Sequence, residues 1–320
     1  MRATAKAQPN IALVKYWGKR DTERNLPATG SISITLDDLY TEMSVEFPPG
    51  LDTDNLTVNG ETGSASLPRV SRCLDELLGP GRGRAQVSSR SNFPIAAGLA
   101  SSASAFAALV VAAAEAAGQQ GTRQELARQA GRASGSAARS LYGGFVELRN
   151  DGDEIRVSNI LTRDQWPLRI LAAVTTTSAK PVSSGEAMEI SRKTSPFYKR
   201  WVDEQDMDLA TARDAIAVKD FGKLASVAEH NCLKMHSVMW TSRPPVVYWN
   251  AATVACLETI RELQHDGIDV FFTIDAGPQV KAICLPDEEE VVANALADVA
   301  GVQDVLASDI GEGATLVPDP

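Results

Sequence analysis

Several side chains of types that perform chemistry stand next to predicted turns. Asp275 follows the apolar run 271–274 and precedes Ala-Gly-Pro. A carboxylate at the end of a buried strand either caps a turn or acts catalytically. Lys15 and Lys19 flank Tyr-Trp-Gly, and a lysine ammonium group is a compact point charge for phosphate. Arg139 stands in a serine- and glycine-rich stretch, and its planar guanidinium can hold a carboxylate through two parallel hydrogen bonds.

A possible phosphate loop occupies residues 94–103, PIAAGLASSA, between a predicted strand and a predicted helix. Small residues let the backbone approach a ligand, and the helix start offers unpaired N–H groups and a positive dipole end to an anion. Ser101 and Ser102 add hydroxyl groups, of which one could bind Mg²⁺ among nucleotide phosphates. Ser102 is the candidate, although the two individual roles stay open. The loop is neither a Walker A loop nor a G-x-G-x-x-G fingerprint, so a plain serine-capped helix is the alternative.

Two further segments have both a structural and a functional interpretation. Residues 134–144, SGSAARSLYGG, could form a second anion site from hydroxyl and N–H groups, or could be a polar surface loop. Residues 9–19, PNIALVKYWGK, could be a strand with a solvated end. However, lysine, tyrosine and tryptophan packed beside an apolar run are costly to bury without a purpose.

Bulk properties exclude several classes of protein. The net charge of −10 argues against general binding to nucleic acids or membrane surfaces, which requires a basic face. The apolar run 11–14 is too short for a signal peptide, and no segment approaches the length of a membrane span. The four cysteines form no C-x-x-C pair, and the three histidines lack metal-ligand spacing. We therefore expect reduced, packed thiols in a cytoplasmic protein.

Hydrophobic periodicity and turn residues predict the elements that must position these side chains. Strands are expected over 41–47, 85–93, 145–149, 170–176, 269–274, 280–285 and 302–308, with a hairpin turn at Asn59-Gly60. Helices are expected over 69–78, 101–117, 123–133, 246–264 and 287–299, with a long helical region over 186–240. Because strands and helices alternate without a steady βαβ rhythm, we expect an α+β fold of two lobes that meet near residues 165–185.

Four segments resemble motifs of one known family. Residues 9–19 closely resemble the P-N-I-A-L-[IV]-K-Y-W-G-K signature of diphosphomevalonate decarboxylases, members of the kinase superfamily that includes galactokinase, homoserine kinase and mevalonate kinase. Residues 94–103 are similar to the P-x-x-x-G-L-x-S-S-A loop of that superfamily. Residues 134–144 resemble S-G-S-A-x-R-S-L-[YF]-G-G, and residues 275–279 resemble D-A-G-P-N with Gln279 in place of asparagine.

The resemblance spans residues 3 to about 310 and implies a fold and an activity. It implies an ATP-binding lobe over 1–175, similar to ribosomal protein S5 domain 2, and a ferredoxin-like lobe over 176–320, with the active site in the cleft between them. The implied reaction is ATP-dependent decarboxylation of (R)-mevalonate 5-diphosphate to isopentenyl diphosphate, ADP, phosphate and CO₂. ATP and Mg²⁺ are expected, with a small-molecule substrate and a homodimeric assembly.

The resemblance also assigns roles to individual residues. The implied catalytic residues are Asp275, Lys15, Arg139, Asn10 and Ser184. The implied substrate contacts are Tyr16, Lys19, Ser134, Gly135, Ser136, Arg139 and Met188. The implied ATP contacts are Pro94, Ala97, Gly98, Leu99, Ala100, Ser101 and Ser102.

Two departures from the family patterns bear on function. Ala100 stands where many superfamily members have glycine, and alanine is usual in the decarboxylase branch. Residues 180–188 are similar to V-S-S-R-x-G-M, but Gly185 replaces the arginine of bacterial members. The loss of this cation keeps open a decarboxylase that acts on mevalonate 5-phosphate. A mevalonate-type kinase without decarboxylation is also open, as is a catalytically silent protein on the same fold, which would have lost Asp275, Lys15 or Arg139.

Overall fold

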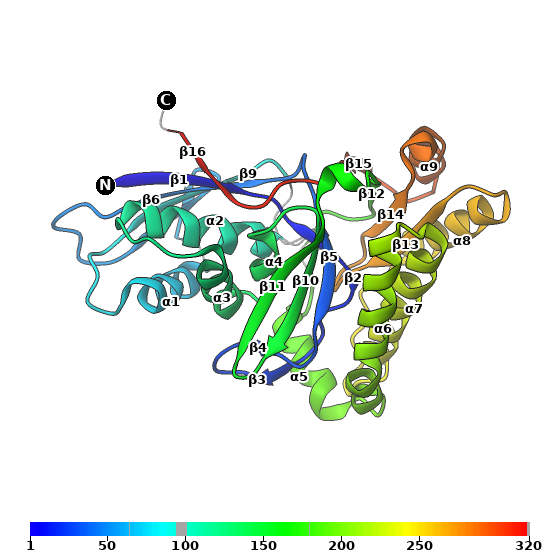
Figure 1. The fold of residues 1–320 in the computed structure, drawn as a ribbon, viewed down its shortest axis with the longest axis horizontal. Helices are drawn as coiled ribbons and strands as arrows, with labels where there is room; N and C mark the ends of the chain where they lie inside the picture. The colour runs from blue at the N-terminus through cyan, green and yellow to red at the C-terminus, as the bar shows by residue number, and fades with distance from the viewer. Residues whose placement is uncertain (64, 94–100, 179, 319–320) are drawn as a thin grey trace.

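The computed structural model describes residues 1–63, 65–93, 101–178 and 180–318. The amino-terminal half contains a mixed sheet with the strand order β16-β1-β6-β9-β7-β8 (Figure 1). These strands are β1 (Arg2–Ala7), β6 (Thr41–Glu46), β7 (Asn55–Val58), β8 (Glu61–Thr62), β9 (Gln86–Ser91) and β16 (Thr315–Val317). Since β16 pairs with β1, the two ends of the chain lie side by side.

Helix α2 (Ser101–Ala116) packs against this sheet through β1 and β6. Its alanine-rich sequence suits a helix that is buried on most sides, because alanine has the highest helix propensity and little bulk. Helices α1 (Leu67–Leu78), α3 (Arg123–Ala133) and the short α4 (Ala137–Ser140) pack around α2. The segment between α3 and α4 therefore lies close to the start of α2.

A second, antiparallel sheet has the strand order β11-β10-β5-β2. Its strands are β2 (Asn10–Val14), β5 (Ser31–Thr35), β10 (Phe145–Asp151) and β11 (Glu154–Leu161). Strand β2 is fully buried and carries the chain directly into Lys15. The short strands β3 (Lys19–Asp21) and β4 (Leu26–Pro27) pair beyond it.

The carboxyl-terminal half follows a βαββαβ order in which four successive helices occupy the first helical position. Its strands are β12 (Arg169–Val174), β13 (Val270–Ile274), β14 (Val280–Cys284) and β15 (Asp304–Ser308), and its helices are α5 (Ser184–Thr194), α6 (Tyr198–Val218), α7 (Phe221–Trp240), α8 (Ala251–His265) and α9 (Glu289–Ala297). The strands pair antiparallel in the order β13-β14-β12-β15, which is the ferredoxin-like arrangement. The predicted α+β class with mixed sheets is therefore confirmed.

The two halves share one apolar core, which fixes the end of β2 beside the β13–β14 turn. Side chains of β2 and β5 pack with side chains of β12, β13, β14, α6 and α7. This core includes Ile11, Leu13, Ile32, Ile34, Ile170, Phe271, Ile283, Leu209 and Leu224. Helix α7 contacts both β2 and β13, so it spans the junction.

Most predicted elements occur near their expected positions, with some corrections. The predicted helical region 186–240 is three helices, because Ser195 ends α5 and Lys219 adopts a left-handed conformation that ends α6. The helix expected from residue 246 begins at Ala251, because the Asn250 side chain accepts a hydrogen bond from Thr253 N. Strands β1, β3, β4, β5, β11 and β16 were not predicted. The division of the chain at residue 175 stays a prediction, and β12 just before it pairs within the carboxyl-terminal sheet.

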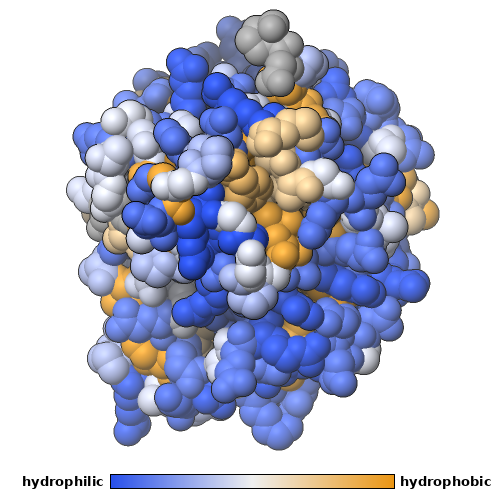
Figure 2. All heavy atoms as spheres, turned by 90° about the vertical axis from the view of Figure 1, so that its left-hand side faces the viewer, coloured by the Kyte–Doolittle hydropathy of each residue, from blue (hydrophilic) through white to orange (hydrophobic). Residues whose placement is uncertain are grey.

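The surface and the cysteines agree with the composition of the chain. The face shown in Figure 2 is mostly hydrophilic, with separate hydrophobic areas between polar side chains. None of the helices in the described residues combines the length and apolar character needed to cross a membrane. Cys73, Cys232, Cys256 and Cys284 are free and buried, as expected for packed thiols.

Trp166 should be important for stability because it packs the segment that connects the two halves against the apolar core. Its ring stacks on Phe145 of β10 with centroids 5.4 Å apart, and both side chains are buried. We expect Trp166→Ala to lower the free energy of unfolding by about 3–5 kcal/mol, measured in urea. The control Phe197→Ala removes a half-exposed ring and should change it by less than about 0.5 kcal/mol. Equal effects of the two variants would contradict this role.

Candidate active site

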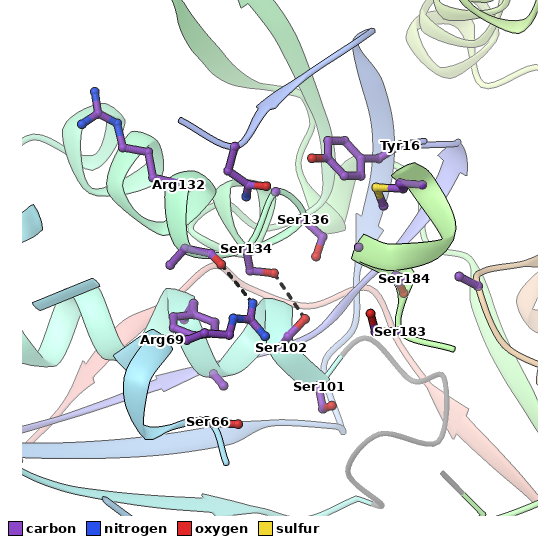
Figure 3. A pocket seen from close by; sticks show the side chains of 18 of the residues that line it. Tyr16, Ser66, Arg69, Ser101, Ser102, Arg132, Ser134, Ser136, Ser183 and Ser184 are labelled. Carbon is purple, nitrogen blue, oxygen red and sulfur yellow. Dashed lines mark hydrogen bonds between the residues drawn. The ribbon is translucent and has the colours of Figure 1, made fainter. Parts of the chain in front are cut away.

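A cavity of about 740 Å³ lies between elements of both halves. Every predicted site residue within the described part of the chain lines it. These residues are Asn10, Lys15, Tyr16, Lys19, Ser101, Ser102, Ser134, Gly135, Ser136, Arg139, Ser184, Met188 and Asp275. Figure 3 shows several of the serine hydroxyls, with Tyr16, around this cavity. The predicted ATP contacts Pro94, Ala97, Gly98, Leu99 and Ala100 lie outside the described residues.

Asp275, which is partly exposed, and the buried Lys15 form an ion pair at the junction of the halves. Lys15 Nζ lies 2.7 Å from Asp275 Oδ1, and only 1% of the lysine side chain is exposed. Burial raises the pKa of Asp275, but attraction to Lys15, Lys281 and Arg139 outweighs burial and lowers this pKa to about 2. The Asp275 carboxyl group is therefore ionised at neutral pH and faces the cavity as an acceptor.

The backbone of Lys15 is held by side chains of α6 and α7. The Lys15 N–H donates to Asn231 Oδ1 at 2.7 Å, and Gln205 Nε2 donates to the Lys15 carbonyl oxygen at 2.7 Å. Asn231 Nδ2 in turn donates to Gln205 Oε1 and to Asp208 Oδ2. Since Gln205 and Asn231 are completely buried, this network fixes the peptide that carries the Lys15 side chain.

Arg139 is buried beside Asn10, and the two side chains form one polar unit. Arg139 Nε and Nη2 both donate to Asn10 Oδ1, at 3.2 and 3.0 Å. Its other bonds run to Ser33 Oγ and Ser31 Oγ in β5. Burial lowers the pKa of Arg139 to about 10, so the guanidinium keeps its charge at neutral pH. Among the described residues these bonds use Nε and one N–H of each terminal nitrogen, which leaves two N–H groups for an anion.

Tyr16 and residues 134–136 line another part of the cavity. The Tyr16 hydroxyl is buried and has no hydrogen-bond partner among the described residues. Burial raises the pKa of Tyr16 well above its ordinary value, so the hydroxyl remains a donor. A Cβ atom at position 135 would lie 2.3 Å from the Tyr16 oxygen, so glycine is required at Gly135. Lys19 is half-buried nearby, and burial together with Arg69 lowers its pKa.

The start of α2 fits the phosphates of a nucleotide. Ser101 and Ser102 occupy its first turn, and Ser102 Oγ lies 3.2 Å from Ser134 Oγ (Figure 3). A sixteen-residue helix directs its positive dipole end into the cavity here. Hydroxyl oxygen is a ligand that Mg²⁺ accepts, so these two serines fit a magnesium ion bound with a nucleotide.

Some charged residues in or beside the cavity were not predicted from the sequence. Lys180 Nζ donates to Ser184 Oγ at 2.7 Å and to the Ala276 carbonyl at 2.9 Å, so it links α5 to the turn after Asp275. Arg69 and Arg132 add positive charge to the wall. Lys281 lies behind Asp275, with its Nζ 3.6 Å from Asp275 Oδ2. A lysine inside the apolar run 280–284 was the signal that could have identified it.

The fold and the site define a class of protein, and comparisons define the family. An α+β chain with a serine-rich helix start facing a lysine–aspartate pair is the arrangement expected of the small-molecule kinase superfamily. Residues 7–158 match the model of the diphosphomevalonate decarboxylase-like N-terminal domain, and residues 170–314 match the mevalonate 5-diphosphate decarboxylase C-terminal domain. The chain therefore belongs to the diphosphomevalonate decarboxylase family.

Individual relatives agree with this assignment. The diphosphomevalonate decarboxylase of Saccharomyces cerevisiae is 34% identical over 312 residues, which cover 90% of this chain and 78% of the relative. The structure of mevalonate diphosphate decarboxylase from Staphylococcus aureus matches with a TM-score of 0.93 at 35% identity, over 99% of this chain and 98% of the other. A structure described as MDDEF in complex with MVAPP, AMPPCP and magnesium matches with a TM-score of 0.93 at 33% identity, over 100% and 99%.

The Asn231 network should contribute measurably to stability. We expect Asn231→Ala to lower the free energy of unfolding by about 1–3 kcal/mol, because it leaves the buried Lys15 N–H without its acceptor and removes one of the contacts of Asp208. Urea unfolding monitored by circular dichroism would measure this. Asn294→Ala, at an exposed position of α9, is the control and should stay within about 0.5 kcal/mol. A wild-type value for Asn231→Ala would refute the proposed backbone clamp.

Proposed function

We propose that this chain catalyses the ATP-dependent decarboxylation of (R)-mevalonate 5-diphosphate to isopentenyl diphosphate, ADP, phosphate and CO₂. The observation that carries the proposal is one cavity that brings together the Asp275–Lys15 pair, the Arg139–Asn10 unit and the serine-rich start of α2. Each group suits one part of the reaction. Membership of the decarboxylase family and the relative bound to MVAPP, AMPPCP and magnesium support it.

Asp275 directs the first step, the transfer of the γ-phosphoryl group to the tertiary 3-hydroxyl. The hydroxyl oxygen bonds to the γ-phosphorus, the bond from this phosphorus to the leaving ADP oxygen breaks, and the hydroxyl proton passes to Asp275. With a pKa of about 2, Asp275 is a weak base that orients the hydroxyl and takes its proton late. That suits a loose transition state, in which positioning and charge neutralisation dominate. Lys15 supplies positive charge at this point.

The nucleotide occupies the side of the cavity at the start of α2. Ser101 and Ser102, with the first-turn N–H groups of this helix, hold the phosphates. Mg²⁺, when bound with the nucleotide, neutralises phosphate charge, and the serine hydroxyls would contribute to holding it.

Arg139 directs the second step, in which CO₂ departs. The C3–O bond breaks and phosphate leaves with the electron pair; the C1–C2 bond then breaks, and its electrons form the C2=C3 double bond. Arg139 holds the carboxylate through its two remaining N–H groups, and Asn10 and β5 fix the orientation of the guanidinium. Because phosphoryl transfer alone needs no carboxylate clamp, this buried unit favours a decarboxylase over a kinase that only phosphorylates.

The phosphorylated end of the substrate lies beside Tyr16, Lys19 and residues 134–136. The unpartnered Tyr16 hydroxyl supplies a donor there, and the lysine supplies charge. Ser184 and Met188 line the wall close to Asp275 and Lys180. Gly185 contributes no side chain, but Arg69 on the opposite wall provides further charge for a diphosphate. The 5-monophosphate remains the alternative substrate on account of Gly185.

An assay with three substrates tests the proposal. Purified protein is given ATP, Mg²⁺ and mevalonate, its 5-phosphate or its 5-diphosphate, and ADP and CO₂ are measured together. We expect one CO₂ per ADP with the diphosphate only. One CO₂ per ADP with the monophosphate would assign the alternative substrate. ADP without CO₂ would identify a kinase and overturn the role given to Arg139.

The assembly and the compartment are also proposed. We propose a homodimer, as the family resemblance implies, and a cytoplasmic location, since free, buried cysteines suit a reducing compartment. Light scattering after size-exclusion chromatography tests the first, and a monomeric mass would exclude it. Cell fractionation tests the second.

Asp275→Asn is the sharpest single substitution. Removing a group that accepts a proton in the transition state typically costs about 10²–10⁴-fold in rate. We expect kcat for CO₂ release to fall by at least about 100-fold, while the protein still binds a nucleotide analogue in a calorimeter. Asp266→Asn, an exposed residue just after α8, serves as control and should keep wild-type activity. Retention of more than about a tenth of the wild-type kcat would remove Asp275 from the mechanism.

A further inference from the structure

Lys281 is a charged residue in the middle of a buried strand. Its side chain is completely buried, and its neighbours in β14 are apolar. In the register of the sheet Lys281 lies opposite Thr273 of β13 and Ala172 of β12, so the three side chains share one face. Thr273 Oγ1 donates to the Ala12 carbonyl in β2, which places this face against the amino-terminal half. A buried ammonium group is costly unless it is paired, so its partner is informative.

The described anionic partner of Lys281 is the carboxylate of Asp275. Lys281 Nζ lies 3.6 Å from Oδ2, while Lys15 Nζ lies 2.7 Å from Oδ1. Two lysines from opposite halves of the chain therefore contact one carboxylate, one at each oxygen. At 3.6 Å the Lys281 contact is an ion pair longer than a strong hydrogen bond. Oδ2 is itself a buried atom, so Lys281 contacts Asp275 at an oxygen that solvent does not reach.

The two lysines differ in their access to the cavity. Lys15 and Asp275 line it, whereas Lys281 does not. The incoming substrates carry a carboxylate and phosphates, and these anions compete with Asp275 for the positive charge of Lys15 and Arg139. Lys281 lies behind the carboxylate, out of reach of the substrates. Because Lys281 does not line the cavity, the incoming anions do not compete with Asp275 for its charge.

We propose that Lys281 is a positioning residue that keeps Asp275 ionised and correctly oriented while Lys15 engages the phosphoryl group being transferred. This inference rests on the proposed function. Lys281 does not touch the substrates and acts only through Asp275. Its removal should therefore impair the chemical step more than the binding of either substrate.

The other titratable and charged groups that face Asp275 determine whether a change in activity with pH can be assigned to Asp275. Besides the two lysines they are Arg139 of α4, Lys180 before α5, and Cys232 and His236 of α7. Burial lowers the pKa of His236 to about 3 and raises the pKa of Cys232, so both are uncharged at neutral pH. Protonation of the substrates' own carboxylate and phosphates affects wild type and variants alike, so an acid-side loss found only in a variant reports the protonation of Asp275.

Removing Lys281 should move the acid side of the pH profile of kcat/KM to higher pH. The pKa of Asp275 is about 2 with both lysines present. Removing one opposite charge within about 4–6 Å typically raises the pKa of a carboxylate by about 1–3 units. In Lys281→Met, kcat/KM should therefore fall further than in the wild type as the pH drops through about 3–5.

The experiment compares Lys281→Met with Thr273→Val. Methionine keeps the length of the side chain without its charge, and Thr273 is the equally buried cross-strand neighbour on the same face. Wild-type release of ADP and CO₂ is measured first, so failure of the proposed function is recognised separately. We expect Lys281→Met to lower kcat by at least about tenfold, with KM values within about threefold, and to show the acid-side loss. Thr273→Val should show neither change.

Two results would overturn the proposal. One is a wild-type kcat in Lys281→Met together with an acid side that matches that of the wild type. The other is an equal loss of kcat in both variants without any change in the pH profile, which would mean that Lys281 acts only in packing. Urea unfolding checks that the variants fold. If Lys281→Met does not fold, Lys281→Gln is assayed by the same two criteria.

Discussion

The structure depends on one carboxylate that is held between buried positive charges from both halves of the chain. Lys15 reaches Asp275 from the end of β2, and Lys281 reaches it from β14. Charges out of water are costly, and breaking a buried pair by removing one partner typically costs about 3–5 kcal/mol. The end of β2 must therefore meet the β13–β14 turn in one register. The shared apolar core and the clamp that Asn231 and Gln205 place on the Lys15 backbone fix that register.

Because the Asp275–Lys15 pair is fixed in place, different residues around the cavity take different tasks. Asn10 and β5 orient Arg139. Arg139 is far from Lys15 and Asp275 in the sequence, but it lies beside this pair in space. Tyr16 follows Lys15 directly, so the strand that supplies the ammonium group also supplies a hydroxyl donor for the phosphorylated end. The start of α2 lies on the cavity wall formed by residues 134–136. Phosphate, carboxylate and hydroxyl groups of one small substrate can therefore be held at the same time.

Much of this site could be predicted because its residues occur in short local motifs. Residues 9–19, 134–144 and 275–279 were each recognisable by themselves, and all their predicted side chains line one cavity. Lys281 was missed because one lysine in a short apolar run looks like an ordinary strand residue until its partner, six positions back, is placed in space. Strand β16 was missed because its pairing with β1 joins the two ends of the chain. The break between α6 and α7 needs a left-handed Lys219, which propensity alone does not indicate.

A double-mutant cycle tests most directly whether Lys15 and Asp275 act as one unit. The variants Lys15→Met, Asp275→Asn and their combination are compared with the wild type by kcat/KM for CO₂ release. If the pair is one unit, the double variant loses no more activity than the more impaired single variant, because the interaction is already gone. If the two losses multiply, each residue acts independently, and the ion pair is not the interaction on which catalysis depends.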